Sequence, residues 1–171
     1  MRKRFARIGK GNARERGQAL VEFTIVVLVF LLFVFGILDM ARLFQSWTDV
    51  QHAAREGARY AVTGRTTCSI NGVSYSTRNE CIKRTVWDAT TGMLGGGKGA
   101  TDATIQVVMQ SWDYPAYTAV SANSAGQPCD AMEVKVTYNH KFVSPLLQFA
   151  APSGISLVGR QRMVNEPFGV C

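Results

Sequence analysis

The chain has 171 residues, of which 47% are hydrophobic and 18% charged, enough for one modest domain with a further segment attached. Its formal charge is +7, but residues 1–17 hold seven of the 19 basic residues against one acidic residue, so the rest of the chain carries only +1. A recurring basic stripe is therefore absent from the sequence, and no nucleic-acid partner is expected. A basic leader beside an apolar run instead sets the orientation of a membrane helix. The seven basic residues are Arg2, Lys3, Arg4, Arg7, Lys10, Arg14 and Arg16.

An apolar run follows the leader. Residues 19–38 contain one charged residue, Glu22. Twenty helical residues span about 30 Å, the thickness of a bilayer's hydrocarbon core, whereas the buried helix of a soluble protein usually keeps a polar stripe. We therefore predict a transmembrane helix over residues 18–38. The positive-inside rule then places the leader, residues 1–17, in the cytoplasm and everything after Asp39 on the outer side of the inner (cytoplasmic) membrane.

A secretory signal peptide is the main alternative for this region. The basic start fits one, but the apolar run exceeds the usual apolar core of about 7–15 residues. The run ends in Ile37-Leu38-Asp39-Met40-Ala41-Arg42, without a small-x-small cleavage site. A cleaved secretory signal stays open as the second interpretation.

The junction between the leader and the apolar run carries a more specific pattern. It reads Glu15-Arg16-Gly17-Gln18-Ala19-Leu20-Val21-Glu22-Phe23. This resembles the processing site of type IV prepilins, in which a membrane peptidase cuts after a glycine and the fifth mature residue is glutamate. Cleavage between Gly17 and Gln18 makes Glu22 the fifth residue.

Placing an ionised carboxylate inside a membrane helix costs about 2.5–3.5 kcal/mol or more of free energy, so such a residue is expected to have a function. Cleavage supplies one, since the new α-amino group at Gln18, with an ordinary pKa of about 7.7–8, can pair with a carboxylate. The resemblance implies that Glu22 meets the amino terminus of a neighbouring subunit. The alternative is an interfacial residue whose carboxylate reaches toward the headgroups.

Two further stretches narrow the resemblance. Phe35-Gly36-Ile37-Leu38-Asp39-Met40-Ala41-Arg42 and Ala53-Ala54-Arg55-Glu56-Gly57-Ala58-Arg59-Tyr60-Ala61 look like the TadE-like pseudopilins of the tight-adherence (Tad, or Flp) pilus. The resemblance is strongest over residues 16–62 and weaker at residues 160–166. Residues 64–130 show no pattern of the family. It implies a minor pilin or pseudopilin of an adhesion and secretion machine. Its partners would be a prepilin peptidase and other pilin subunits, and an assembled extracellular pilus would be a second location.

The resemblance also assigns roles to residues. Major subunits of such pili favour tyrosine after the glutamate and are much shorter, whereas this chain has Phe23, so a bulk-subunit role is disfavoured. The predicted processing residues are Gly17 and Gln18, and the predicted assembly residues are Glu22 and Phe23. The predicted helix-packing residues are Arg55, Glu56, Gly57, Ala58 and Arg59.

The helix is predicted to continue past the membrane as an amphipathic extension over residues 39–63. Apolar and small residues recur there at three- and four-residue steps, and Gly64 is a natural C-terminal stop. Counted from Gln18 to Thr63 the helix has 46 residues and a length of about 69 Å. Gly57 leaves a smooth patch that packs on the chain's own sheet, the favoured interpretation, or on another subunit. The stripe consists of Leu43, Trp47, Val50, Ala54, Gly57, Ala58 and Ala61.

Residues 64–171 are predicted to form an extracytoplasmic α+β head domain, with the long helix packed on a small antiparallel sheet in a pilin-like arrangement. Glu80 to Met93 has helical spacing. Residues 95–99 read as a glycine-rich linker, because they lack the lysine and serine or threonine pair of a phosphate-binding loop. Strands are expected over Ala103–Trp112, Met132–Tyr138 and Ile155–Val164, with loops over Ser111–Cys129 and Ser144–Gly154.

The cysteines Cys68, Cys81, Cys129 and Cys171 all follow the membrane helix, so they lie where disulfides persist. Four cysteines allow three pairings, and the sequence alone does not choose among them. Our hypothesis joins Cys68 to Cys81, closing a local loop with a turn at Asn71-Gly72, and Cys129 to Cys171, on the assumption of a hairpin centred near residue 150. No Cys-x-x-Cys or His/Cys cluster indicates zinc, and neither a metal nor a cofactor is expected.

No catalytic constellation is apparent. The two histidines, His52 on the helix and His140 at a strand end, have no recognisable nucleophile or carboxylate partner in the sequence. Asp39 and Arg42 form an i,i+3 pair that marks the membrane boundary rather than a proton relay. The sequence predicts a non-enzymatic assembly component. A signal-anchored or secreted extracytoplasmic binding domain unrelated to pili is the alternative, and the mature N-terminus distinguishes the two.

Overall fold

The structure is a computed structural model, in which the chain divides into two compact units, residues 1–38 and 39–171. One helix, α1 (Ala13–Val62), supplies the described part of the first unit and begins the second. Most of the predicted leader lies outside the described residues, and so does Met93 of the predicted second helix. The structure describes residues 13–92, 94–97 and 99–171.

In the first unit, α1 begins at Ala13, ahead of the predicted start at Gln18. The difference has a local cause: Ala, Arg and Glu are good helix formers, and residues 13–16 contain only these types. A single glycine, Gly17, costs about 0.5–1 kcal/mol relative to alanine, too little to stop the helix. The predicted leader boundary therefore lies within the first turns of α1.

The stretch of α1 that starts at Gly17 is long and apolar enough to cross a membrane, and its most apolar part is not buried at all within the described chain. The core helix of a soluble protein would be mostly covered by its own fold. This exposure therefore favours a membrane-spanning helix over a core helix, while a signal sequence would look the same.

The second unit is built on a four-stranded antiparallel sheet with the strand order β4-β3-β5-β6, and β1 and β2 form a separate hairpin. The longest ladder joins β5 to β6, from Ala131 opposite Val164 to His140 opposite Ile155. The elements are β1 (Cys68–Ile70), β2 (Val73–Tyr75), α2 (Arg78–Ala89), β3 (Ile105–Asp113), β4 (Thr118–Ala122), β5 (Ala131–His140), α3 (Pro145–Ala150) and β6 (Ile155–Val164).

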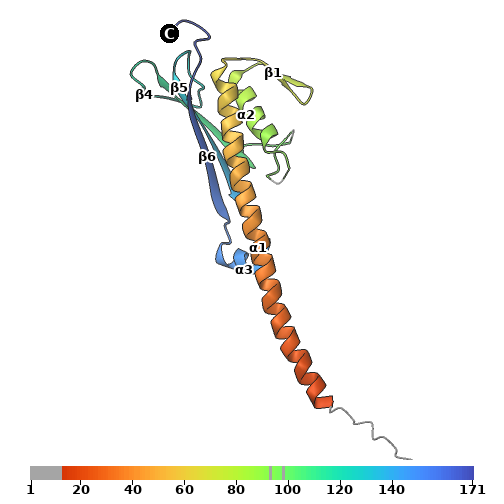
Figure 1. The fold of residues 1–171 in the computed structure, drawn as a ribbon. Helices are drawn as coiled ribbons and strands as arrows, with labels where there is room; N and C mark the ends of the chain where they lie inside the picture. The colour runs from red at the N-terminus through yellow and green to blue at the C-terminus, as the bar shows by residue number, and fades with distance from the viewer. Residues whose placement is uncertain (1–12, 93, 98) are drawn as a thin grey trace, which may run out of the picture. The chain divides into compact units, whose positions relative to one another are not determined.

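The α1 residues of this unit lie along the sheet, with α2 beside them (Figure 1). The predicted α+β fold, a long helix packed on an antiparallel sheet, is confirmed. Alternate residues of the central strands supply the sheet's share of the core. They include Val107 and Met109 of β3 and Met132, Val134 and Val136 of β5, all at most 2% exposed.

The buried stripe of α1 confirms most of the predicted pattern, with one correction. Trp47 is 49% exposed, and Ser46, which is 1% exposed, takes its place in the stripe. Steps of four and three residues from Ser46 lead to Val50 and Ala53, the path that a helix of 3.6 residues per turn follows. Trp47 lies one position off that path, beside the stripe. The fully buried members are Val50, Ala53, Ala54, Ala58 and Ala61.

Two glycines allow α1 to approach its neighbours closely. A Cβ on Gly57 would collide with the side chain of Val86 in α2 and lie 3.3 Å from that of Val134 in β5, so this residue packs inside the chain's own fold, more closely on α2 than on the predicted sheet. A Cβ on Gly159 of β6 would lie 2.6 Å from the carbonyl oxygen of Val50. The backbones of β6 and α1 therefore meet where no larger residue fits. Gly64, with φ of 68°, donates its N–H to the carbonyl of Ala61 at 3.2 Å and ends the helix as predicted.

The second helix is shorter than predicted and ends at Ala89. Its end is fixed by the carbonyl of Trp87, which accepts the Thr90 N–H at 3.3 Å and the Gly97 N–H at 2.6 Å. The glycine-rich linker thus folds back onto the end of α2. The indole of Trp87 donates to the carbonyl of Ile105 at 3.0 Å and so joins α2 to β3.

Four elements lie in stretches for which the sequence predicts no helix or strand. The predicted loop 111–129 contains β4, the predicted loop 144–154 contains α3, and the stretch between Gly64 and α2 contains β1 and β2. Each has at most six residues, too few to show a hydrophobic period. The turn at Asn71-Gly72 does hold, with positive φ at both residues.

The two disulfides join Cys68 to Cys81 and Cys129 to Cys171, the predicted pairs. The assumption behind the second pair needs correction. Extending the β5–β6 register beyond Ala131 and Val164 would place Glu166, not Cys171, opposite Cys129. The segment after β6 instead turns toward α1, where the Glu166 N–H bonds the carbonyl of Val62 at 3.0 Å, before the chain reaches the disulfide.

Candidate functional site

The predicted processing and assembly residues lie together at the start of the apolar helix. Gly17, Gln18, Glu22 and Phe23 are all exposed residues of α1, and the position of a Cβ on Gly17 has no neighbour within 4 Å. The bond between Gly17 and Gln18 is therefore helical and is not covered by the described part of the first unit.

Glu22 is the one acidic residue in the apolar stretch, and its carboxylate accepts a hydrogen bond from the side-chain amide of Gln18 at 3.2 Å. Side chains of an α-helix lean toward its N-terminus, so residues four apart lie on one face. The carboxylate of Glu22 thus lies over the turn that begins at Gln18. Cleavage after Gly17 would create a positive charge in that turn.

The neighbouring residues are suited to lipid. Phe23 is 66% exposed, and the hydroxyl of Thr24 donates to the carbonyl of Leu20 in its own helix at 2.7 Å. A hydroxyl that is satisfied within its helix leaves no unpaired donor facing hydrocarbon. Among these residues Glu22 is therefore the unusual group.

A second group of polar residues, missed from the sequence, lies at the start of the second unit. Asp39 is 3% exposed, and its carboxylate accepts the backbone N–H groups of Val143 at 3.2 Å and Ser144 at 2.8 Å. Burial opposes ionisation of Asp39, but these hydrogen bonds and the charge of Arg42 outweigh it and lower the pKa of the carboxyl. Asp39 was predicted to pair with Arg42, whereas its close partners come from the loop before α3.

Asp39 therefore fastens the β5–β6 connection to α1. We expect Asp39→Ala to leave two backbone N–H groups without their acceptor, at a cost of about 1–3 kcal/mol. Hydrogen exchange followed by mass spectrometry should show faster exchange at Val143 and Ser144. Asp49→Ala, on the same helix, is the control and should leave these amides protected. Unchanged protection in Asp39→Ala would contradict the role.

His140 lies one residue before that connection and is 4% exposed. Its Nδ1 lies 3.3 Å from the hydroxyl of Ser46, and its buried Nε2 has no hydrogen-bond partner among the described residues. Burial lowers the pKa of His140 below its ordinary value of 6.5, Arg42 lowers it further, and Asp39 opposes them. The imidazole is thus held neutral inside the fold.

This neutral histidine predicts acid sensitivity. As the pH falls through the ordinary pKa of 6.5, His140 takes up a proton more readily in the unfolded chain than in the folded one, so the free energy of unfolding falls as the pH drops. We expect the Tm of the head to decrease between about pH 7 and pH 5. The Tm of His140→Phe should decrease less over this pH range than that of the wild type. The Tm of His52→Asn, in which an exposed residue is replaced, should decrease as much as that of the wild type. An equal decrease of Tm with pH in the wild type and both variants would contradict the prediction.

The five predicted helix-packing residues divide into two groups. Gly57 and Ala58 are buried against the fold, whereas Arg55 and Arg59 are exposed and Glu56 is half-buried. Arg59 and Glu56 form an i,i+3 ion pair of 3.5 Å on the outer side of α1. In the part of the chain that the structure describes, no group of three or more His, Cys, Asp or Glu side chains could hold a metal ion.

Residues 17–59 match the family model described as TadE-like protein. This part of the chain is TadE-like. The match begins at Gly17, includes Glu22 and Asp39, and ends at Arg59 near the end of α1. A TadE-like segment indicates a Tad pilus-associated protein, and it is consistent with attachment to a membrane through a single apolar helix.

The TadE-like segment does not reach the sheet, the cysteines or the stretch 160–166, where the sequence shows a weaker likeness to the same family. No curated protein and no solved structure matches the chain. The TadE-like segment thus holds the predicted processing and assembly residues and the α1 stripe up to Ala58, whereas Ala61 and the strands that pack on the stripe lie outside it.

Proposed function

We propose that the chain is a minor pilin or pseudopilin of a Tad-type adhesion pilus and secretion machine. Residues 18–38 anchor it in the inner membrane, with the N-terminus inside and the head, residues 64–171, outside. The observation that carries the proposal is the TadE-like match over residues 17–59, because it begins at the predicted cleavage glycine and includes Glu22. The two disulfides support a location outside the cytoplasm, where such bonds persist.

A prepilin peptidase is the proposed first partner, cutting between Gly17 and Gln18. The bond is helical before cleavage, so the enzyme has to open the first turns of α1. Two features lower the cost of opening. The turns lie close to the helix start, where the first four N–H groups have no intrahelical partner, and glycine favours helix less than any residue except proline.

Cleavage then prepares the chain for assembly. The new amino group of Gln18 and the carboxylate of Glu22 are opposite charges at one end of an apolar helix. In a single chain the carboxylate can reach headgroups or accept the Gln18 amide, as it does at 3.2 Å. In a bundle of subunits lipid and water are displaced, and pairing with the amino group of a neighbour becomes the favourable arrangement. The role is structural, with no reaction catalysed by the chain.

The mature N-terminus tests this proposal most directly. Intact-mass analysis of the protein extracted from membranes should show the loss of residues 1–17 and a chain that begins at Gln18. Gly17→Asp should accumulate as the full-length membrane protein, because the glycine is the residue that the peptidase reads. A wild-type chain that begins between Asp39 and Ala61 would instead establish a secretory signal, and a released binding domain would replace the pilin.

A further inference from the structure

The connection between β5 and β6 exposes three apolar side chains that are spaced three residues apart. Val143, Leu146 and Phe149 are 58%, 53% and 89% exposed, and no residue of α3 is buried. Residues 142–159 include no charged side chain. Exposed apolar groups in a stretch of chain without charges are typical of a surface that meets an apolar partner.

Hydrogen bonds attach this connection to α1 at Asp39. Asp39 accepts the N–H groups of Val143 and Ser144, so the chain enters α3 beside this residue. Figure 1 shows α3 next to α1, at the end of the sheet away from the β1–β2 hairpin. Asp39 directly follows Leu38, the last residue of the apolar run, and successive helical residues rise by only about 1.5 Å. The apolar surface is therefore tied to the residue that directly follows the predicted membrane span in the sequence.

We propose that Val143, Leu146 and Phe149 form a second membrane contact and insert into the interfacial layer of the outer leaflet. The contact rests on the membrane-spanning role of residues 18–38 in the proposed function. A short helix that lies in the interface typically buries its apolar side about 5–10 Å into the boundary between headgroups and acyl chains. The head would then be attached to the bilayer at two places rather than by α1 alone.

The hydrogen bonds of this connection suit such a place. The N–H groups of Val143 and Ser144 bond Asp39, and those of Leu147 and Gln148 bond the hydroxyl and carbonyl of Ser144. Backbone groups without water must be satisfied within the protein. The carboxylate of Asp39 and the hydroxyl and carbonyl of Ser144 meet this need, so placing the segment against lipid leaves these four donors paired.

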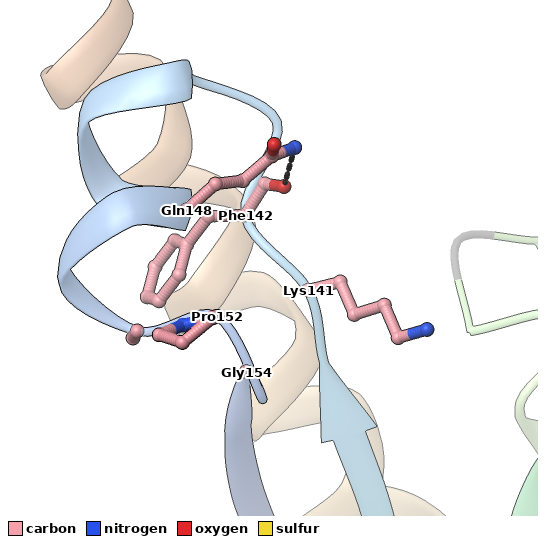
Figure 2. Close-up of a pocket in the computed structure, with 6 residues that line it drawn as sticks. Lys141, Phe142, Gln148, Pro152 and Gly154 are labelled. Carbon is pink, nitrogen blue, oxygen red and sulfur yellow. Dashed lines mark hydrogen bonds between the residues drawn. The ribbon is translucent and has the colours of Figure 1, made fainter.

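A ligand pocket explains the surface less well. A hollow of about 210 Å³ lies beside α3. Figure 2 shows the Lys141 side chain pointing away from Phe142 and Gln148, while the Gln148 amide donates to the carbonyl of Phe142 at 2.9 Å. The polar groups around the hollow are thus turned away or already paired. The three exposed apolar side chains, in contrast, face no described neighbour that covers them.

Site-specific photocrosslinking tests the contact in the full chain. Phe149 is replaced by p-benzoylphenylalanine, and the purified protein is reconstituted into nanodiscs of phosphatidylethanolamine and phosphatidylglycerol. The same analogue at Phe30, in the predicted span, is the positive control. At Val73, which is 46% exposed in the β1–β2 hairpin, it is the negative control. Because Phe149 is almost fully exposed, its replacement removes no core packing.

We expect phospholipid adducts at positions 149 and 30 and none at position 73. An adduct at position 30 without one at position 149 would overturn the second contact alone. A crosslink from position 149 to another copy of the chain, in place of lipid, would assign the surface to subunit packing and also overturn the proposal. The absence of adducts at both positions 149 and 30 would overturn the membrane-spanning role as well, which separates the two failures.

Discussion

Replacing Glu22 by alanine is expected to stop pilus assembly while leaving the protein folded and in the membrane. Glu22 is exposed, and its one described contact is the Gln18 amide, so its loss removes nothing from the core of the head. In an assembled bundle, by contrast, Glu22→Ala would leave the amino group of a neighbour without a partner. Removing one member of a buried ion pair costs about 3–5 kcal/mol, which lowers incorporation by at least about a hundredfold.

The measurement compares surface piliation, processing and membrane levels in cells whose native copy is replaced by the variant. Thr24→Ala is the matched control, because Thr24 is a polar residue of the same helix whose hydroxyl bonds only its own backbone. The control should assemble normally. Normal piliation by Glu22→Ala at normal protein levels would make Glu22 an interfacial bystander and remove the main physical argument for a pilin role.

Gly159→Ala is expected to destabilise the head more than its single methyl group suggests. The new Cβ would meet the carbonyl oxygen and carbon of Val50, which belong to a helix backbone and cannot rotate away. Overpacking of this kind typically costs about 1–3 kcal/mol. We expect a clearly lower Tm for the head in thermal unfolding of the purified protein.

Gly99→Ala provides the control, since a Cβ there has no neighbour within 4 Å among the described residues and its φ is not in the left-handed region. Its Tm should stay close to that of the wild type. If Gly159→Ala were equally neutral, α1 and β6 would have to lie further apart than in the structure.

The sequence predicts those elements of the fold that repeat a pattern over several residues. The last strand, Ile155–Val164, has the predicted bounds, and the predicted strand Met132–Tyr138 lies wholly within β5. The stripe of α1 is also largely correct, because small residues at helical steps suit few structures other than a closely packed helix. The candidate processing and assembly residues stay a prediction, which rests on a local pattern: a charge at a fixed distance from a glycine.

What the sequence does not show is set by contacts between distant residues. Asp39 reads as one half of a local pair with Arg42, yet its carboxylate bonds N–H groups more than a hundred residues away. The six residues of α3 are too few for a period, although Ser144 before Pro145 is a typical helix start. Likewise β4 is an edge strand of five residues held by β3 alone. The partners of Asp39, the short helix α3 and the edge strand β4 all depend on contacts with distant parts of the folded chain.

In the proposed topology, the α1 stripe leaves the membrane before the strands on which it packs. The helix ends at Val62, while the first strand of the four-stranded sheet begins at Ile105 and the last at Ile155. A chain exported in sequence order therefore presents the alanine-rich stripe of α1 outside the membrane well before the strands that cover it arrive. During that interval the exposed stripe can aggregate with other chains. The interval is long because contacts between residues distant in sequence, such as those of α1 with β6, form slowly. Anchoring the emerging chain in the bilayer would keep it apart from its neighbours until β6 has paired with β5.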